Sequence, residues 1–259
     1  MNVGISRTSR RARVLVATAV AMAIGLGGAP VASAAETPPP SRDVRDFACP
    51  LSEVPAAGFV DTADNLFELE IDCLAWYGIT RGGPGGRPAN EYGPSLSVTR
   101  AQMATFLVKF VDYVDETLVA GYDNNNRFDD VADNGTHVAS INRLAVAGIV
   151  TGGANGGPAT DYSPLDAVSR DQMASFIART LKLILNGNIC VENPDYFDDD
   201  DASVHSTCIN GLADTAIASG TGGGNFSPEA DVTRAQMAAF LMRAMDLLVQ
   251  QELAFPPAS

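Results

Sequence analysis

The chain contains three copies of one pattern at equal intervals along the sequence (128 − 59 = 197 − 128). Each copy opens on a Phe-x-Asp triplet, at Phe59, Phe128 and Phe197. An apolar segment, a glycine-rich loop and an aromatic-x-Pro turn follow, with the aromatic residue at Tyr92, Tyr162 and Phe226. Each copy ends in Val-Thr/Ser-Arg-x-Gln-Met-Ala, beginning at Val98, Val168 and Val232. Because one copy is too small to bury its own apolar face, the fold and the function belong to the array.

Apolar residues follow the last motif of each copy at helical spacing. In the first copy this stripe consists of Met103, Phe106, Leu107, Phe110, Val111 and Val114, and equivalent stripes begin at Met173 and Met237. Such spacing places the side chains on one face of a helix. A capping box precedes each stripe, formed by Thr99 with Gln102, Ser169 with Gln172, and Thr233 with Gln236. The sequence therefore predicts one long helix in each copy.

A shorter helix is predicted earlier in each copy. In the second copy, Ile141, Leu144, Ala145, Gly148 and Ile149 lie on one helical face, and Gly152-Gly153 would end the helix. Each copy is then a helix–loop–helix repeat. We expect an all-α fold in which the three long helices pack together as a pseudo-threefold bundle.

Residues 1–34 have the composition of an export signal. Four arginines between Arg7 and Arg13 precede an apolar core from Val14 to Leu26, and Ala32-Ser33-Ala34 resembles a cleavage site. Residues 35–58, which include Pro38-Pro39-Pro40, are expected to form an extended lead-in. We expect an exported protein with no membrane span after removal of the signal.

The charge balance excludes some partners. The chain has 17 Lys and Arg against 31 Asp and Glu, a net charge of −14. Removing the four arginines of the signal changes the balance to −18 (13 − 31). Nucleic acids and anionic membranes require a basic footprint, so neither is expected as a partner.

The four cysteines are placed in parallel. Cys49 and Cys190 precede the first and third copies, and Cys73 and Cys208 lie in the short helices that follow. Four cysteines allow three connectivities. The parallel placement favours two local disulfides, Cys49–Cys73 and Cys190–Cys208, each worth roughly 3 kcal/mol in the chain-entropy model. A structural metal is not expected, since the sequence contains no Cys-x-x-Cys and no paired histidines.

The remaining chemistry-bearing residues favour structural roles. His137 and His205 occupy a position that the first copy fills with Phe67, which argues against catalytic histidines. The acidic runs Asp198–Asp201 and Asp129-Asp130 with Asp133 offer calcium ligands, but they lack the spacing of a known loop and are interpreted as solvated turns and caps. No catalytic acid pair or Ser-His-Asp set is apparent. We expect no enzyme activity, no metal and no cofactor.

The three copies resemble the S-layer homology (SLH) domain, as found in secreted proteins of high-GC Gram-positive bacteria. The resemblance covers residues 59–250 and rests on the Phe-x-Asp opening, the loop after Gly78-Ile79, the aromatic-x-Pro turn and the arginine motif, with glutamine where the family often has glutamate. It implies three tandem units, which we name unit one (59–118), unit two (128–186) and unit three (197–250). It also implies a pseudo-threefold SLH-type bundle.

The resemblance implies non-covalent attachment to cell-wall polysaccharide, often through a pyruvylated sugar bound in grooves between units. The motif arginines, Arg100, Arg170 and Arg234, are then the ligand-binding residues. Each would lie at the first helical position beside free backbone amides, a suitable site for a carboxylate. The adjacent aromatic residues, Tyr92, Tyr162 and Phe226, would either stack on a sugar or pack in the interior.

Two alternatives stay open at this stage. The arginines could instead join neighbouring units by pairing with Asp61, Asp130 and Asp199. The whole chain could instead be a structural S-layer subunit or an adaptor that acts through contacts with other surface proteins.

Overall fold

The computed structural model describes residues 42–121, 125–132, 135–153, 156–191 and 193–258. The expected signal at residues 1–34 and the first part of the lead-in lie outside this range, as does Asp133. Six α-helices occupy the described residues, with two 3₁₀ turns, η1 (Pro84–Gly86) and η2 (Glu116–Val119), and no β-strand. The predicted all-α fold class is confirmed for this part of the chain.

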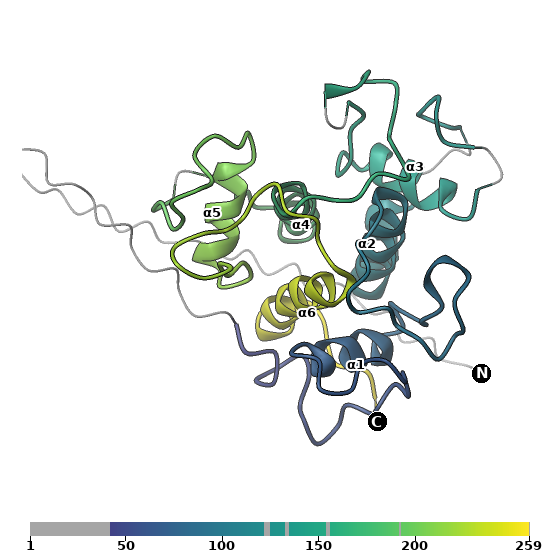
Figure 1. Ribbon diagram of the computed structural model, residues 1–259, viewed down its shortest axis with the longest axis vertical. Coiled ribbons are helices and arrows are strands. Elements are labelled where there is room, and N and C mark those ends of the chain that lie inside the picture. The colour runs from purple at the N-terminus through teal and green to yellow at the C-terminus, as the bar shows by residue number, and fades with distance from the viewer. Residues whose placement is uncertain (1–41, 122–124, 133–134, 154–155, 192, 259) are drawn as a thin grey trace, which may run out of the picture. The chain divides into compact units, whose positions relative to one another are not determined.

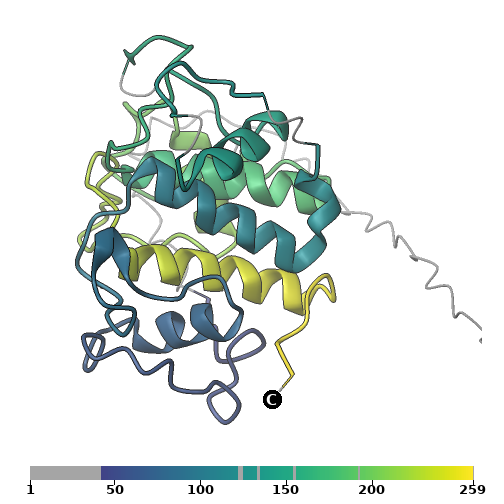
Figure 2. The same ribbon diagram turned by 90° about the vertical axis from the view of Figure 1, so that its right-hand side faces the viewer.

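Three long helices lie at the centre of Figure 1, and each begins at a motif arginine. They are α2 (Arg100–Asp115), α4 (Arg170–Leu185) and α6 (Arg234–Gln250). Helix α4 packs against both α2 and α6, and Figure 2 shows α2 and α6 along their lengths. Their buried faces contain the predicted stripes, so amphipathic periodicity located these helices correctly.

Three short helices surround the long ones in Figure 1, namely α1 (Glu68–Trp76), α3 (Val138–Val146) and α5 (Ser206–Asp214). Each packs against the long helix of another unit, because α3 contacts α2, α5 contacts α4, and α1 contacts α6. The first and last units are therefore in contact with each other.

The end of α3 differs from the prediction. The helix ends at Val146 and does not continue to Gly152-Gly153. Gly148 adopts a left-handed conformation with φ of 71°, and the amide of Ile149 donates to the carbonyl of Leu144 at 2.9 Å. This glycine cap ends the helix early because only a residue that tolerates positive φ can reverse the chain there.

Hydrogen bonds between three equivalent valines close a ring among the units. The amide of Val98 donates to the carbonyl of Val232, Val232 donates to Val168, and Val168 donates to Val98, each at 2.9 Å. All three valines are fully buried. The ring holds the starts of the three long helices together at one end of the bundle.

Both predicted disulfides are present. Cys49 is bonded to Cys73 and Cys190 to Cys208. The first one fixes the lead-in against α1, while Asp246 of α6 accepts hydrogen bonds from the amides of Phe47 and Ala48 at 3.1 and 3.0 Å. These bonds pack the lead-in against the bundle beside Cys49. Among the described residues, no helix combines the length and apolarity that a membrane crossing requires.

Candidate functional site: the arginines and the grooves between units

The three motif arginines are buried between units. Arg100, Arg170 and Arg234 are only 3, 5 and 3% exposed. Each Nε donates at 2.7 Å to the backbone carbonyl of an aromatic residue in another unit: Tyr162, Phe226 and Tyr92, respectively. Each guanidinium carbon also lies 4.5–4.6 Å from the ring centroid of the same aromatic residue. These contacts combine a charge-assisted hydrogen bond with a cation–π interaction.

The arginines differ in their remaining donors. Arg100 also donates to the carbonyl of Thr151 and the side chain of Gln172, each at 3.4 Å. Arg170 donates to the carbonyl of Ser219 at 3.2 Å. Nη1 and Nη2 of Arg234 form no hydrogen bond within the described residues. Burial lowers the pKa of all three guanidinium groups, that of Arg170 to about 10.

The structure corrects the expectation of free amides beside the arginines. The amides of Arg100 and Ala101 donate to the carbonyls of Asp166 and Pro164 at 2.9 and 3.0 Å. Equivalent bonds fill the starts of α4 and α6. The first amides of a helix have no intrahelical acceptor, and here another unit supplies it. An anionic ligand would therefore meet arginine side chains and no open helix N-terminus.

The aspartates of the Phe-x-Asp triplets hold the turns that carry the aromatic residues. Asp61 accepts from the amides of Tyr92 and Gly93 at 2.7 and 2.8 Å. Asp130 and Asp199 bind the equivalent turns of their own units. The arginines thus join the units, as the alternative interpretation held, but their acceptors are backbone carbonyls and, for Arg100, also the Gln172 side chain, and not the aspartates. Tyr92, Tyr162 and Phe226 are completely buried, so of the two roles considered for them the structure shows packing in the interior and not stacking on a sugar.

One of the three capping boxes is absent. Thr99 with Gln102 and Thr233 with Gln236 form the predicted reciprocal bonds. At α4, Asp171 accepts hydrogen bonds from the hydroxyl of Ser169 and the amide of Gln172 instead. A carboxylate is a stronger acceptor than a hydroxyl, and this substitution releases the Gln172 side chain to accept from Arg100.

Two grooves lie beside the buried arginines, each lined by residues of all three units. The first, which we call the basic groove, has a volume of about 370 Å³ and is lined by the loop at residues 79–86, by α2, by Thr136 and His137, and by Arg234. Its charged lining residues are Arg81, Lys109 and Arg234, with no Asp or Glu among the described lining residues. The electrostatic potential in this groove should favour anions despite the acidic composition of the chain.

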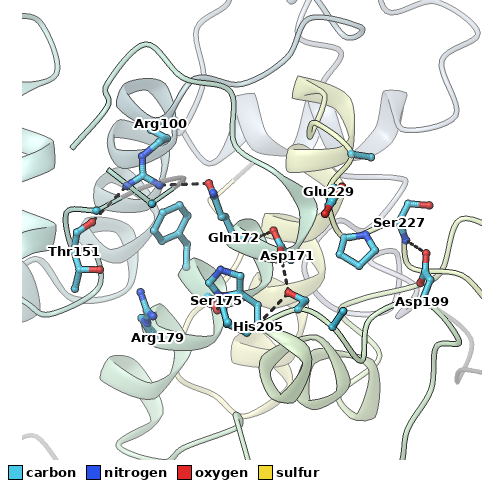
Figure 3. A pocket seen from close by; sticks show the side chains of 18 of the residues that line it. Arg100, Thr151, Asp171, Gln172, Ser175, Arg179, Asp199, His205, Ser227 and Glu229 are labelled. Atoms are coloured by element: carbon cyan, nitrogen blue, oxygen red, sulfur yellow. Dashed lines mark hydrogen bonds between the residues drawn. The ribbon is translucent and has the colours of Figure 1, made fainter. Parts of the chain in front are cut away.

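The second, which we call the mixed groove, has a volume of about 790 Å³ and is shown in Figure 3. It is lined by the glycine loop after Thr151, by α4, by residues 202–205 before α5, and by Arg100. Arg100 and Arg179 face it together with Asp171, Asp199 and Glu229. Since both signs of charge are present, this groove has no clear preference for an anion.

The histidines line the grooves. Nδ1 of His137 lies 2.7 Å from the hydroxyl of Thr105 in the basic groove, and Nδ1 of His205 lies 2.8 Å from the hydroxyl of Ser175 in the mixed groove. Burial lowers the pKa of both histidines; the charge of Asp171 opposes this at His205 and that of Arg179 adds to it.

Sequence reasoning missed this pairing, although a signal was present. Thr105 and Ser175 occupy the same position after the motif arginine of units one and two, and each pairs with the histidine of the following unit. Unit three has Ala239 at this position, and unit one, which packs against it, has Phe67 in place of a histidine. Hydroxyl and histidine thus occur together, and alanine and phenylalanine replace them together.

A second set of basic residues was also missed. Lys109, Arg179 and Arg243 occupy one position after the motif arginine, and they donate to the carbonyls of Ile79, Ile149 and Ile217 at 3.1, 3.3 and 3.4 Å. The signal in the sequence was a basic side chain at this position of all three units. Lys109 and Arg179 line the two grooves.

Comparison with known proteins supports part of the resemblance. Residues 199–238, within unit three, match the S-layer homology domain. An exoglucanase, XynX, of Acetivibrio thermocellus is 26% identical over 186 residues, and an amylopullulanase of Thermoanaerobacterium thermosulfurigenes is 25% identical over 186 residues. Each alignment covers 71% of this chain, but only 16% and 9% of the relatives' lengths. The domain match points to association with the bacterial cell surface.

Proposed function

We propose that the chain is a secreted, non-catalytic protein whose three tandem SLH-like units bind a cell-wall polysaccharide in the grooves between them. The units are those at 59–118, 128–186 and 197–250, preceded by a signal peptide and a lead-in. Three features support three units: the equal spacing of the Phe-x-Asp triplets, the valine ring and the recurrent arginine contacts. Alignments of 186 residues are also much longer than any one unit.

The basic groove is the observation that carries the proposal. It gathers three cationic side chains and no acidic one among the described lining residues, in a chain with a net charge of −14. Arg234 has two guanidinium nitrogens that form no hydrogen bond with the described residues, and the exposed side chain of Arg81 also lines the groove. These groups match a polysaccharide that carries carboxylates, such as a pyruvylated secondary polymer.

We assign Arg234 as the principal ligand contact. Arg100, which faces the mixed groove, and Arg170 keep the predicted binding role, but both are more fully engaged in joining the units. The proposal includes no catalytic step. A wall zymogram tests that part, and cleared bands at the mass of this protein would contradict it.

Co-sedimentation with purified wall sacculi, before and after acid stripping of secondary polymer, tests the proposal. Binding that disappears on stripping supports it, and binding that survives moves the target to peptidoglycan. Absence of binding would favour a structural or adaptor role through protein contacts.

Arg81→Gln is the cleanest test of the basic groove, because this exposed side chain forms no hydrogen bond that the fold requires. Loss of one charged contact of about 1 kcal/mol lowers affinity about fivefold. Arg87→Gln in the same loop is the matched control, because Arg87 pairs with Glu91 at 2.6 Å and does not line the groove. Equal affinities of the two variants would exclude the basic groove as the binding site.

A further inference from the structure

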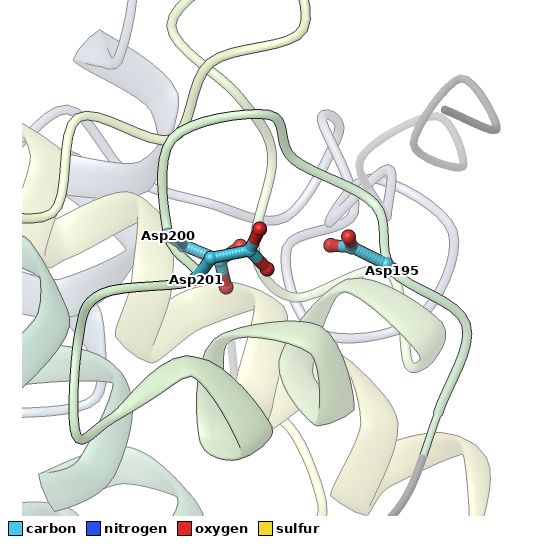
Figure 4. Close-up of side chains that lie close together, drawn as sticks. All are labelled: Asp195, Asp200 and Asp201. Atoms are coloured by element: carbon cyan, nitrogen blue, oxygen red, sulfur yellow. The ribbon is translucent and has the colours of Figure 1, made fainter. Parts of the chain in front are cut away.

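Three carboxylates converge just before α5, next to the Cys190–Cys208 disulfide. Asp195, Asp200 and Asp201 each place one oxygen within 4.8 Å of the other two (Figure 4). Oxygens that bind one Ca²⁺ at about 2.4 Å lie no more than about 4.8 Å apart, and the three carboxylates meet this limit. Asp195 and Asp201 are exposed, whereas Asp200 is fully buried.

A buried oxygen of Asp200 points to a ligand independently of this clustering. Oδ2 accepts a hydrogen bond from Nδ2 of Asn210 at 3.1 Å. Oδ1 is inaccessible and has no hydrogen-bond partner among the described residues. A buried carboxylate is stable when it is fully hydrogen-bonded, paired with a cation or bound to a metal. The Ser206 hydroxyl lies near the Asp200 carboxylate but makes no bond of hydrogen-bond geometry to Oδ1, and no cationic side chain among the described residues pairs with this oxygen.

Unit two provides a comparison within the same molecule. When Phe197 is aligned with Phe128, the three aspartates correspond to Asn126, Val131 and Ala132, with no carboxylate among them. There, Nδ2 of Asn126 donates to the carbonyl of Val131, and Oδ1 of Asn126 accepts from Asn142 at 3.3 Å. A neutral amide thus crosslinks the loop in unit two.

Unit three cannot form that crosslink. Asp195 stands in place of Asn126 and has no N–H to donate. Asp200 stands in place of Val131 and brings a second charge into the same loop. A bound cation would satisfy the oxygens of both residues and so replace the amide donor of unit two.

The negative charges around Asp200 also favour a bound cation. Asp195, Asp199 and Asp201 all lie near enough to Asp200 to repel its negative charge. Asp199 itself is engaged with the amides of Phe226 and Ser227. Without a cation, the loop therefore contains several carboxylates that repel one another.

We propose that Asp195, Asp200 and Asp201 bind one Ca²⁺, with water completing the coordination. The ligands are all oxygens, which suits a hard cation, whereas zinc favours nitrogen and sulfur. Two of the three carboxylates are exposed, so the ion keeps access to solvent ligands, as calcium tolerates. Extracellular calcium modules of this kind have a Kd of about 0.1–1 mM.

The position of the site gives the ion a structural consequence. Residues 202–205, which follow Asp201 directly, form one wall of the mixed groove and lead into α5. A cation held by Asp195 and Asp201 would fix this wall against the beginning of the same loop, which the Cys190–Cys208 disulfide closes. Calcium should therefore order the groove wall without contacting the groove's ligand.

The test uses the full chain after treatment with a chelator. Tb³⁺ is the direct probe, since Tyr196 adjoins Asp195 and can sensitise terbium emission, with Ca²⁺ as the competitor. Isothermal titration with Ca²⁺ gives the affinity. We expect one site per chain and, at about ten times the Kd, a rise in Tm of about 3–6 °C.

Matched variants locate the site. Asp195→Asn and Asp201→Asn should each weaken Ca²⁺ binding about tenfold or more, whereas Asp198→Asn, in the same acidic run, should retain it. The triple variant Asp195→Asn/Asp200→Val/Asp201→Ala copies unit two; it should fold, be insensitive to Ca²⁺ and melt above the chelated parent protein. No binding by the parent protein at about 10 mM Ca²⁺, well above the expected Kd, would overturn the proposal. Equal weakening of binding in the Asp198→Asn and Asp201→Asn variants would also overturn it.

Discussion

Replacing the motif arginines one at a time should destabilise the protein in a fixed order. Arg100→Ala removes three side-chain hydrogen bonds, Arg170→Ala two and Arg234→Ala one. Each substitution also removes the two aromatic contacts of its guanidinium group, which are nearly alike in distance. The cation–π and packing losses should therefore be similar, and the hydrogen bonds should set the order.

The magnitude follows from these contacts. A short charge-assisted hydrogen bond contributes about 1.5–3 kcal/mol, and a desolvated cation–π contact about 1–2 kcal/mol. The two bonds of Arg100 at 3.4 Å are long and should add little each. We therefore expect Arg100→Ala to cost about 3–5 kcal/mol, with Arg170→Ala slightly below and Arg234→Ala lowest. For a chain of this size, such a loss lowers the Tm by about 6–20 °C.

Urea unfolding followed by circular dichroism measures the free energies of unfolding, and Arg87→Ala serves as the control for loss of an exposed arginine. Arg100→Lys separates charge from shape, because lysine keeps the charge but loses the planar contact with the Tyr162 ring. A loss below about 1 kcal/mol for Arg100→Ala, the range of an exposed ion pair, would refute the assignment of this residue as a link between units. An order in which Arg234→Ala is the most damaging would refute the hydrogen-bond argument.

Three further predictions concern other parts of the bundle. Burial lowers the pKa of His137 and His205, so the folded state favours their neutral forms. Their contribution to stability is therefore complete above about pH 6.5 and is lost as the pH falls through the folded-state pKa values. The difference in unfolding free energy between the parent protein and a His137→Phe/His205→Phe variant should change across that range. Replacing Cys190 and Cys208 by alanine should cost about 3 kcal/mol in urea unfolding, and a change of sign would contradict the chain-entropy estimate. Asp130→Ala leaves two turn amides without their acceptor and should cost about 2–4 kcal/mol, whereas an unchanged Tm would show that water replaces the carboxylate.

Sequence reasoning identified features that depend on neighbouring residues. The helical period located the long helices, and α2, α4 and α6 begin at the expected arginines. The parallel spacing of Cys49 and Cys73 with Cys190 and Cys208 led to the correct disulfides. Local rules succeeded at these points because nearby parts of the chain determine the outcome.

The sequence-based predictions failed where residues far along the chain determine the hydrogen bonds or the burial of a group. The helix amides at Arg100 and Ala101 are satisfied by the carbonyls of Asp166 and Pro164 in the next unit, and no local signal shows this. At the start of α4, Asp171 accepts the hydrogen bond from the Gln172 amide that the Ser169 hydroxyl was expected to accept. The capping-box rule considers only Ser169 and Gln172, so it does not foresee this. The orphan oxygen of Asp200 depends on its burial by the surrounding loop, whereas the sequence shows only an acidic run.

Because the three units close into a circle, the chain should tolerate circular permutation. An open solenoid has end units that need special caps, but here α1 of unit one covers α6 of unit three, and Arg42 reaches Gln250 at 2.9 Å. No unit among the three is thus a terminal unit with an uncovered face. Circular permutants opened between units should retain the fold, whereas deletion of any unit would expose two apolar faces together. Unfolding should then proceed as a single cooperative event and not unit by unit.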